Sequence, residues 1–461
     1  MLFWWDIPRV QNRPIAPLSI ADCCPEHVYK NTMLRVHDLL NWTSQERREL
    51  GMDAILERCA GLDVHQETVV ACVLHGPLDR KPKQETQTFS TTTKGLLALH
   101  DWLSQHACSH VAMESTGVYW KPVWNILEGD FELILANAHR IKNVPGRKTD
   151  VHDAQWIAQL LRCGLIEPSF VPTEDLRDLR DLTRYRRKLL GDATAEKNRI
   201  HKILQDANIK LTTYVSDVFG VSGMALLESV VNGEVLTTEQ VKGMVFTKLK
   251  NKVPQLVEAL NGRVRAHHRR MIRMHLDHLQ YIEKQIEGLE IDIGKLLNPH
   301  QEAIDMLMTI PGVQEDVAAS ILAEIGDDMS HFPSDAHLAS WAGVSPGNNE
   351  SAGKKKGTRT AKGNRGLKAV LSQAAWAASK KKNCRIASFF YRIQKRRGQK
   401  KATIATAHLI LRIAYHVLKE RVSYQELGSD YLPNRDRTMS YWIKKLQDQG
   451  YTVTLEQSVS A

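Results

Sequence analysis

The sequence has 461 residues, with 62 Lys and Arg against 52 Asp and Glu and a formal net charge of +10. This length predicts about two to four domains, and the ordinary composition excludes global disorder. No stretch approaches the roughly 18 uninterrupted apolar residues of a membrane span, and the amino terminus lacks the pattern of a signal peptide. The seven Cys are scattered without a CxxC pair, which indicates a reducing, cytoplasmic compartment rather than a disulfide framework or a zinc site.

Short apolar runs in the first half of the chain predict strands. Residues 1–52 show no sustained periodicity and are an unassigned extension. From residue 53, CAGLDVHQ and TVVACVL predict a hairpin, and HVAMES and FELILANA predict two further strands. A basic loop, HRIKNVPGRKT, then precedes a helix that begins at Asp150 and ends at Gly164. Strands and helices together over 53–170 predict an α/β domain.

Long helices are predicted over 171–300. Between Ile272 and Leu296 apolar residues recur mostly at steps of three and four, over about three to four heptads, which is the pattern of a coiled coil. An earlier helix, from Leu176 to Leu204, has a weaker seam that Arg186 and Lys197 interrupt. The seam either packs the two helices as a hairpin within one chain or joins two protomers, and the sequence favours neither alternative.

A mainly helical, basic domain is predicted over 301–425, followed by a tail over 426–461. Near its start, Ile310-Pro311-Gly312-Val313 is similar to the turn of helix-hairpin-helix modules, which hold a DNA phosphate with backbone N–H groups. The alternative is a plain turn between two helices. From Ser351 to Lys419 the chain has 19 Lys and Arg and no Asp or Glu. Because such residues release counterions from phosphates, the segment predicts a nucleic-acid-binding surface.

Four carboxylates are candidates for a metal site. Asp63 lies within an apolar strand, where an uncompensated charge is costly, and Glu114 ends another strand. Asp150 and Asp153 are three residues apart at a helix start and share one face of that helix. If the strands are neighbours and the helix covers their ends, the four side chains converge, and oxygen ligands of this kind suit Mg²⁺ or Mn²⁺. Each also has a structural explanation, such as a helix cap for Asp150.

The candidate nucleophile is Ser351, in the glycine-rich and basic segment GVSPGNNESAGKKKGTRTAKGNRG. A serine hydroxyl needs a base or a metal to become a nucleophile. No His lies close to Ser351 in the sequence, so the carboxylates with their metal are the candidate activator. Without them Ser351 is an ordinary loop serine; Ser345, which precedes Pro346, is a weaker candidate.

These pieces, in this order, resemble the transposases of the insertion-sequence 110 family, also called DEDD or Piv-like recombinases. The resemblance covers about residues 58–420 and is carried by GLDVHQ, AMESTGVYW, ANAHRIKNVPGRKTDVHDA, IPGV and WAGVSPGNNESAGKKKGTRTAKGN. The commoner form of the family has Gly directly after the serine, whereas this chain has Ala352, as in the PGNNESAGK-type branch that it resembles.

The resemblance implies a multidomain α/β and α architecture: an RNase H-like (Holliday-junction-resolvase-like) amino-terminal domain, a long helical coiled-coil linker and a mainly helical carboxyl-terminal transposase domain. It implies that Asp63, Glu114, Asp150 and Asp153 bind Mg²⁺ and that Ser351 attacks the DNA phosphodiester through a covalent phosphoserine intermediate. It also implies a guide non-coding RNA that selects donor and target double-stranded DNA. Finally, it implies homodimers or homotetramers whose active sites combine domains of different protomers.

Three hypotheses for the function follow. The first is an RNA-guided, nucleoid-associated DNA recombinase with a serine nucleophile. The second is a metal-dependent Holliday-junction resolvase or nuclease in which water attacks, and the third is a non-catalytic protein that only binds nucleic acid. The residues assigned to nucleic-acid binding are Lys354, Lys355, Lys356, Arg359, Lys362, Arg365 and Gly312.

Overall fold

The computed structural model describes residues 53–115, 117–136, 150–347, 349–351, 354–357, 360, 363–429 and 442–454. Their contacts divide the chain into two compact units, with the boundary between Val171 and Pro172. The predicted extension over 1–52 lies outside the described residues, and the division expected at residue 300 falls inside the second unit. Within the described residues no helix is long and apolar enough to cross a membrane.

The first unit contains a mixed five-stranded sheet with the strand order β3-β2-β1-β4-β5. The strands are β1 (Arg58–Val64), β2 (Thr68–His75), β3 (Lys83–Ser90), β4 (His110–Glu114) and β5 (Glu132–Ala136). β1, β2 and β3 pair antiparallel, so the predicted hairpin of the first two strands is confirmed. β4 runs parallel to β1 and β5 runs parallel to β4. This arrangement confirms an α/β domain and is consistent with the RNase H-like fold that the family resemblance implies.

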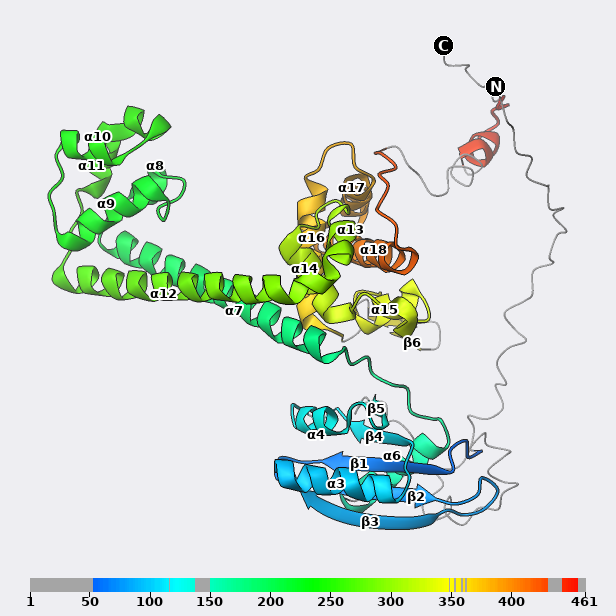
Figure 1. Cartoon of the computed structure of the whole chain (residues 1–461). Helices are drawn as coiled ribbons and strands as arrows, with labels where there is room; N and C mark the ends of the chain where they lie inside the picture. The colour runs from blue at the N-terminus through cyan, green and yellow to red at the C-terminus, as the bar shows by residue number, and fades with distance from the viewer. Residues whose placement is uncertain are drawn as a thin grey trace, which may run out of the picture. The chain divides into compact units, whose positions relative to one another are not determined.

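Helices cover both faces of this sheet (Figure 1). On one face α3 (Thr93–Gln105) and α4 (Trp120–Leu127) pack against apolar strand residues such as Leu62 and Met113. On the other face lies α6 (Asp150–Arg162), which buries Ala154, Ile157 and Ala158 against the strands. Because successive strand residues face opposite sides, β1, β2, β4 and β5 each contribute to both cores, whereas β3 contributes only Phe89.

In the described residues the second unit is helical apart from β6 (Asn349–Ser351) and β7 (Lys354–Gly357). Its longest helices, α7 (Glu174–Asp206) and α12 (Ala266–Leu297), lie side by side. Near one end of this pair the intervening elements gather around their own apolar core (Figure 1). These elements are α8 (Leu211–Tyr214), α9 (Val221–Asn232), α10 (Thr238–Met244), η1 (Thr247–Lys252) and α11 (Val253–Leu260).

The predicted apolar seam of α12 packs against α7 of the same chain. Leu279, Ile282 and Ile286 of α12 form one buried cluster with Leu189 and Ala193 of α7. The two polar interruptions of the α7 seam have partners across this contact. Arg186 donates to Glu290 at 2.9 Å, and the ammonium of Lys197 lies 3.2 Å from a carboxylate oxygen of Glu283. The seam therefore forms a hairpin within the chain.

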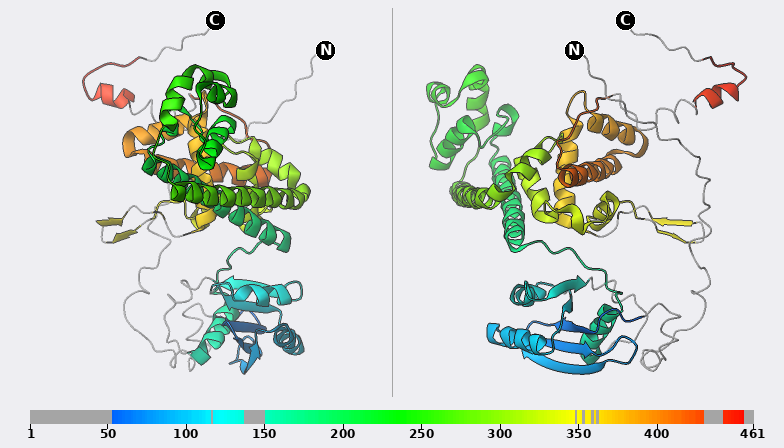
Figure 2. Two further views of the ribbon diagram at one scale, coloured as in Figure 1. Left: turned by 90° about the vertical axis from the view of Figure 1, so that its left-hand side faces the viewer. Right: turned by 45° about the vertical axis from the view of Figure 1, so that its right-hand side comes forward.

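The remaining helices form a bundle in which α18 contacts α13, α15, α16 and α17. They are α13 (Gln301–Met308), α14 (Glu315–Ile325), α15 (Asp335–Trp341), α16 (Arg365–Ser379), α17 (Arg385–Arg397) and α18 (Gln399–Glu420), with short 3₁₀ turns η2 (Asn298–His300) and η3 (Met329–His331). The β6–β7 hairpin extends away from this bundle (Figure 2).

The IPGV motif is the turn between α13 and α14. Gly312 has φ +89°, and a Cβ placed on it would lie 2.4 Å from the carbonyl oxygen of Ala374 in α16. The glycine is therefore required by its backbone conformation and by close packing on α16. This explains the motif structurally, and a contact of Gly312 with DNA stays a prediction.

Candidate active site and nucleic-acid interface

The sheet register brings Asp63 and Glu114 to the same edge. β1 and β4 are parallel, with Gly61 opposite Ala112 and Leu62 opposite Met113, so the next residues along each strand are Asp63 and Glu114. Ala112 belongs to the core beneath α6, and Asp63 and Glu114 follow the pair Gly61 and Ala112 by two residues. Both carboxylates therefore point to the α6 side of the sheet. The Asp63 side chain is 13% exposed and Glu114 is 8% exposed.

The start of α6 lies at this same edge because the helix runs antiparallel to β1. The carbonyl oxygen of Arg162, at the end of α6, accepts a hydrogen bond of 2.8 Å from the N–H of Ile55, just before β1. Farther along β1, the Cys59 thiol donates to the carbonyl oxygen of Ala158 at 3.5 Å. The first turn of α6, which carries Asp150 and Asp153, therefore lies toward the end of β1. We call Asp63, Glu114 and this first turn the carboxylate edge.

Gly61 sets how closely α6 approaches the sheet. A Cβ on Gly61 would lie 2.3 Å from both the carbonyl oxygen of Ala154 and the amide nitrogen of Ala158. A side chain at this position would push the helix away from β1. The glycine of the GLDVHQ motif thus holds the α6 backbone beside the strand that carries Asp63.

The structure adds His65 to the carboxylate edge. Its Nε2 atom lies 3.2 Å from Oδ2 of Asp63, and its side chain is more than half exposed. The sequence analysis did not select this residue. The available signal was its spacing of two from Asp63, which places both side chains on one side of an extended chain.

The donor set of the carboxylate edge suits a hard divalent cation. Asp63, Glu114 and Asp153 offer only oxygen ligands, as Mg²⁺ and Mn²⁺ prefer, and Asp153 is half-buried at the start of α6. The side chain of Asp150 lies outside the described part of the chain. Two groups of three residues in the described part have ligand atoms within 4.8 Å of one another. They are His75, Glu85 and His106, and Asp206, His267 and His268, and neither group includes a residue of the carboxylate edge.

The segment that carries Ser351 is closed at its base. We call residues 343–364 the serine segment. A Cβ on Gly363 would lie 2.4 Å from the amide nitrogen of Gly343, Pro346 forms a β-bridge with Thr360, and Lys368 donates to the carbonyl oxygen of Gly343 at 3.0 Å. These contacts hold the two ends of the segment together.

Ser351 lies at the far end of the β6–β7 hairpin. It is the last residue of β6, and its backbone pairs with Lys354 at the start of β7. The side chains of Ser351 and of Lys354, Lys355 and Lys356 lie outside the described part of the chain, as do Arg359 and Lys362 altogether. Of the residues assigned to nucleic-acid binding, Arg365 is exposed at the start of α16.

A second group of basic side chains lies on the helices that follow the serine segment. These residues were counted in the basic run but not selected as a site. All are exposed, at the end of α16, along α17 and at the start of α18: Lys380, Lys381, Lys382, Arg392, Lys395, Arg396, Arg397, Lys400 and Lys401. We call them the helical basic surface.

Two family models match the chain over the regions that carry these sites. Residues 60–209 match the model DEDD_Tnp_IS110, described as a transposase, and residues 304–392 match the model described as the IS116/IS110/IS902 transposase family. The chain belongs to the IS110 family of transposases. The first match contains all four candidate carboxylates and the second contains Ser351. Transposases catalyse DNA strand transfer, and a DEDD domain implies the use of a divalent metal.

Curated relatives include proteins of insertion elements and of gene inversion. The chain is 32% identical over 151 residues to the "Insertion element IS110 uncharacterized 43.6 kDa protein" of Streptomyces coelicolor. The aligned residues cover 32% of this chain and 36% of that protein. It is 26% identical over 370 residues to the "Pilin gene-inverting protein" of Moraxella bovis, which covers 78% of this chain and 95% of that protein. Over 150 residues it is 29% identical to the Moraxella lacunata protein of the same name, which covers 31% of this chain and 46% of that protein.

Proposed function

We propose that this chain is the transposase of an insertion sequence, a site-specific recombinase that cuts DNA strands and rejoins them in a new order. The observation that carries the proposal is the carboxylate edge: in a chain of the IS110 family, β1, β4 and α6 bring Asp63, Glu114 and the first turn of α6 to one end of an RNase H-like sheet. The similarity to a pilin gene-inverting protein, over 95% of that protein's length, supports DNA rearrangement rather than DNA binding alone.

In the proposed reaction the carboxylates hold the metal and the serine breaks the strand. Asp63, Glu114, Asp150 and Asp153 bind Mg²⁺ or Mn²⁺, which, when bound, stabilises charge on the phosphate oxygens. The hydroxyl oxygen of Ser351 attacks the phosphorus, and its proton passes to solvent water. The bond from phosphorus to one DNA oxygen breaks, and that oxygen takes up a proton. The phosphoserine linkage is itself a phosphodiester between Ser351 and the DNA, so a hydroxyl of another strand can attack its phosphorus and release the serine.

We also propose that an RNA encoded by the element guides the choice of donor and target DNA, and that the enzyme acts as a homodimer or homotetramer. Both parts rest on the family resemblance. The 19 Lys and Arg between Ser351 and Lys419, with no Asp or Glu, support the binding of nucleic acid by this part of the chain.

The test is the detection of a covalent adduct between protein and DNA. Purified protein is incubated with donor DNA, the element's RNA and Mg²⁺, and the products are separated on a denaturing gel. Ser351→Ala is expected to abolish the protein-linked strand, whereas the control Ser345→Ala, in the same segment, is expected to retain it. If Ser351→Ala cleaves DNA at the parental rate, water is the nucleophile and the chain is a nuclease or junction resolvase.

A further inference from the structure

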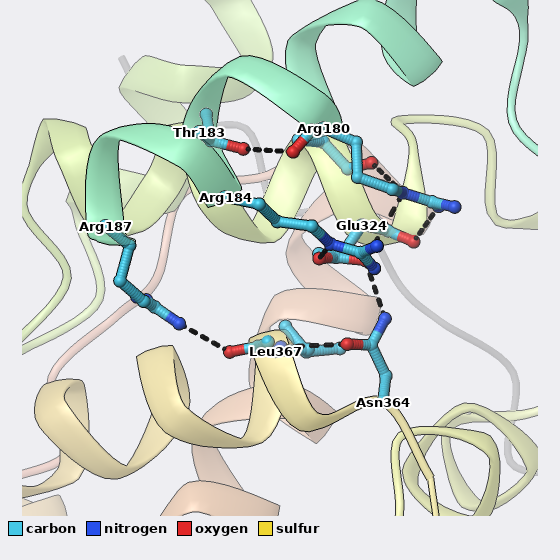
Figure 3. A network of polar contacts seen from close by, with 9 residues as sticks. Arg180, Thr183, Arg184, Arg187, Glu324, Asn364 and Leu367 are labelled. Carbon is cyan, nitrogen blue, oxygen red and sulfur yellow. Dashed lines mark hydrogen bonds and ion pairs between the residues drawn. The ribbon is translucent and has the colours of Figure 1, made fainter. Parts of the chain in front are cut away.

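A buried carboxylate of the second unit joins three distant parts of the chain (Figure 3). Glu324, near the end of α14, is 3% exposed. Arg184 of α7 donates to its two oxygens from Nε and a terminal nitrogen, at 2.7 and 2.9 Å. Nε of Arg180, one turn earlier on α7, lies 3.3 Å from Oε2. Bidentate pairing of this kind fixes the carboxylate in both distance and orientation.

Glu324 also accepts a hydrogen bond of 2.6 Å from the side-chain amide of Asn364. Asn364 is the N-cap of α16: its Oδ1 accepts from the N–H of Leu367 at 3.0 Å. One residue therefore ends the serine segment, starts α16 and contacts the buried carboxylate. A third arginine of α7, Arg187, donates to the carbonyl oxygen of Gly366 in the first turn of α16, at 2.7 Å. We call Arg180, Arg184, Glu324 and Asn364 the Glu324 cluster.

The packing around the cluster leaves little freedom. A Cβ on Gly366 would lie 2.9 Å from Oε1 of Glu324, so the first turn of α16 is in direct contact with the carboxylate. Burial lowers the pKa of Arg180 to about 10, which still leaves its guanidinium protonated at neutral pH. Removing one member of a buried ionic network leaves the others without compensation, so such a network holds its members in one arrangement.

The cluster acts on the end of the serine segment. The base of that segment is the close approach of Gly343 and Gly363, and Asn364 follows Gly363 directly. Asn364 is bound to Glu324, and Glu324 is bound to the arginines of α7. These contacts therefore fix one side of the base of the serine segment. The other side is tied to α16 through Lys368 and the carbonyl oxygen of Gly343.

We propose that the Glu324 cluster is a positioning device, which uses α7 to hold the serine segment in the orientation required for attack. The proposal rests on the proposed function, because it takes Ser351 as the nucleophile. It goes beyond that function in assigning a role to residues of α7 and α14 that act on the serine segment through Asn364. The row of arginines on α7 links the long helical hairpin to the serine segment.

The first test measures the segment itself, by hydrogen exchange of the backbone amides of residues 343–347 and 363–370. The substitution Asn364→Ser keeps a side-chain oxygen that can accept the N-cap hydrogen bond. It removes the side-chain amide that donates to Glu324. Glu324→Gln replaces the buried carboxylate by a neutral amide of similar shape. Losing a hydrogen bond to a charged group is expected to speed exchange in both variants by about ten- to a hundredfold. Arg186→Ala is the control, since Arg186 lies on α7 and pairs with Glu290 instead.

The second test measures the proposed reaction in the same variants. Asn364→Ser and Glu324→Gln are expected to slow single-turnover formation of the protein-linked strand by about tenfold or more, while the Kd for donor DNA stays within about twofold. Parental exchange rates in both variants, or equal slowing by Arg186→Ala, would overturn the proposal. Asn364→Ser alone decides the test if Glu324→Gln fails to fold. A parental protein that forms no adduct through Ser351 would refute the proposed function and leave the exchange test of the cluster intact.

Discussion

Single residues decide both the spacing and the chemistry of the carboxylate edge. At Gly61 the backbone of α6 lies so close that a methyl group would overlap two of its atoms. We expect Gly61→Ala to lower the free energy of unfolding of the first unit by about 1–3 kcal/mol, because overpacking forces the helix and strand apart. Hydrogen exchange of β1 and α6 amides measures this loss. The control is Gly191→Ala in α7, where a Cβ has open space, and we expect no loss of stability there.

The acidic residues themselves are tested by isosteric amides. We expect Asp63→Asn and Glu114→Gln to reduce strand cleavage by about a hundredfold or more, because a metal ligand that stabilises charge contributes several kcal/mol to the reaction. The rate is measured across a Mg²⁺ titration. Asp101→Asn on α3, where the side chain is 74% exposed, is the matched control and should leave the rate unchanged. Parental rates in the first two variants would remove the carboxylate edge from the mechanism.

Among the elements, the hairpin of α7 and α12 contains a buried charge that depends on pH. Glu196 of α7 accepts hydrogen bonds from His275 and His278 of α12, at 2.6 and 3.0 Å. Burial acts to raise the pKa of Glu196, but these hydrogen bonds and the charge of Arg199 hold it below its usual value. A lowered pKa in the folded state means that the carboxylate stabilises the hairpin above pH of about 4.3, the pKa in the unfolded chain, and loses this effect as the pH falls through the folded value.

We therefore expect Glu196→Gln to destabilise the hairpin at pH 7 by about 1–3 kcal/mol, because the variant loses hydrogen bonds to a buried charged group. Below pH of about 4 the difference between the parent and the variant should shrink. Thermal unfolding followed by circular dichroism at both pH values measures it. Glu283→Gln, which removes a half-exposed partner of Lys197, should change stability by less than about 1 kcal/mol. A pH-independent difference would contradict the role given to Glu196.

Over the whole molecule, the basic charge is concentrated in the carboxyl-terminal part, and its structure adds the helical basic surface to the residues of the serine segment. We expect replacement of Lys395, Arg396 and Arg397 by Gln to weaken DNA binding and to reduce the slope of log K against log salt by up to about 3, since each phosphate contact contributes about 0.9. Lys242, Lys248 and Lys250, exposed near α10 and η1, are the matched control for charge removal. Equal slopes in the two triple variants would show that net charge alone acts, without contacts at α17.

Local patterns made much of the fold predictable. The apolar runs of β1, β2, β4 and β5 and the start of α6 at Asp150 are visible in the sequence because burial of a strand or helix leaves a regular pattern. β3 was not predicted: its residues are mostly polar and exposed, as suits the edge of a sheet, so no apolar run marks it. The sequence did not show which helix packs against the apolar seam of α12. The pattern indicates that these residues are buried, but it does not identify the helix that covers them.

The sequence by itself determined the types of the apolar strands and long helices, the position of the charge and the motifs that identify the family, because each of these depends on residues that are close together in the chain. Only the tertiary structure decided that Gly312 packs on α16 and that Glu324, an unremarkable residue of an apolar helix, meets Asn364 forty residues away and Arg184 a hundred and forty residues away. Such contacts depend on the path of the chain between them. Local periodicity carries no information about that path.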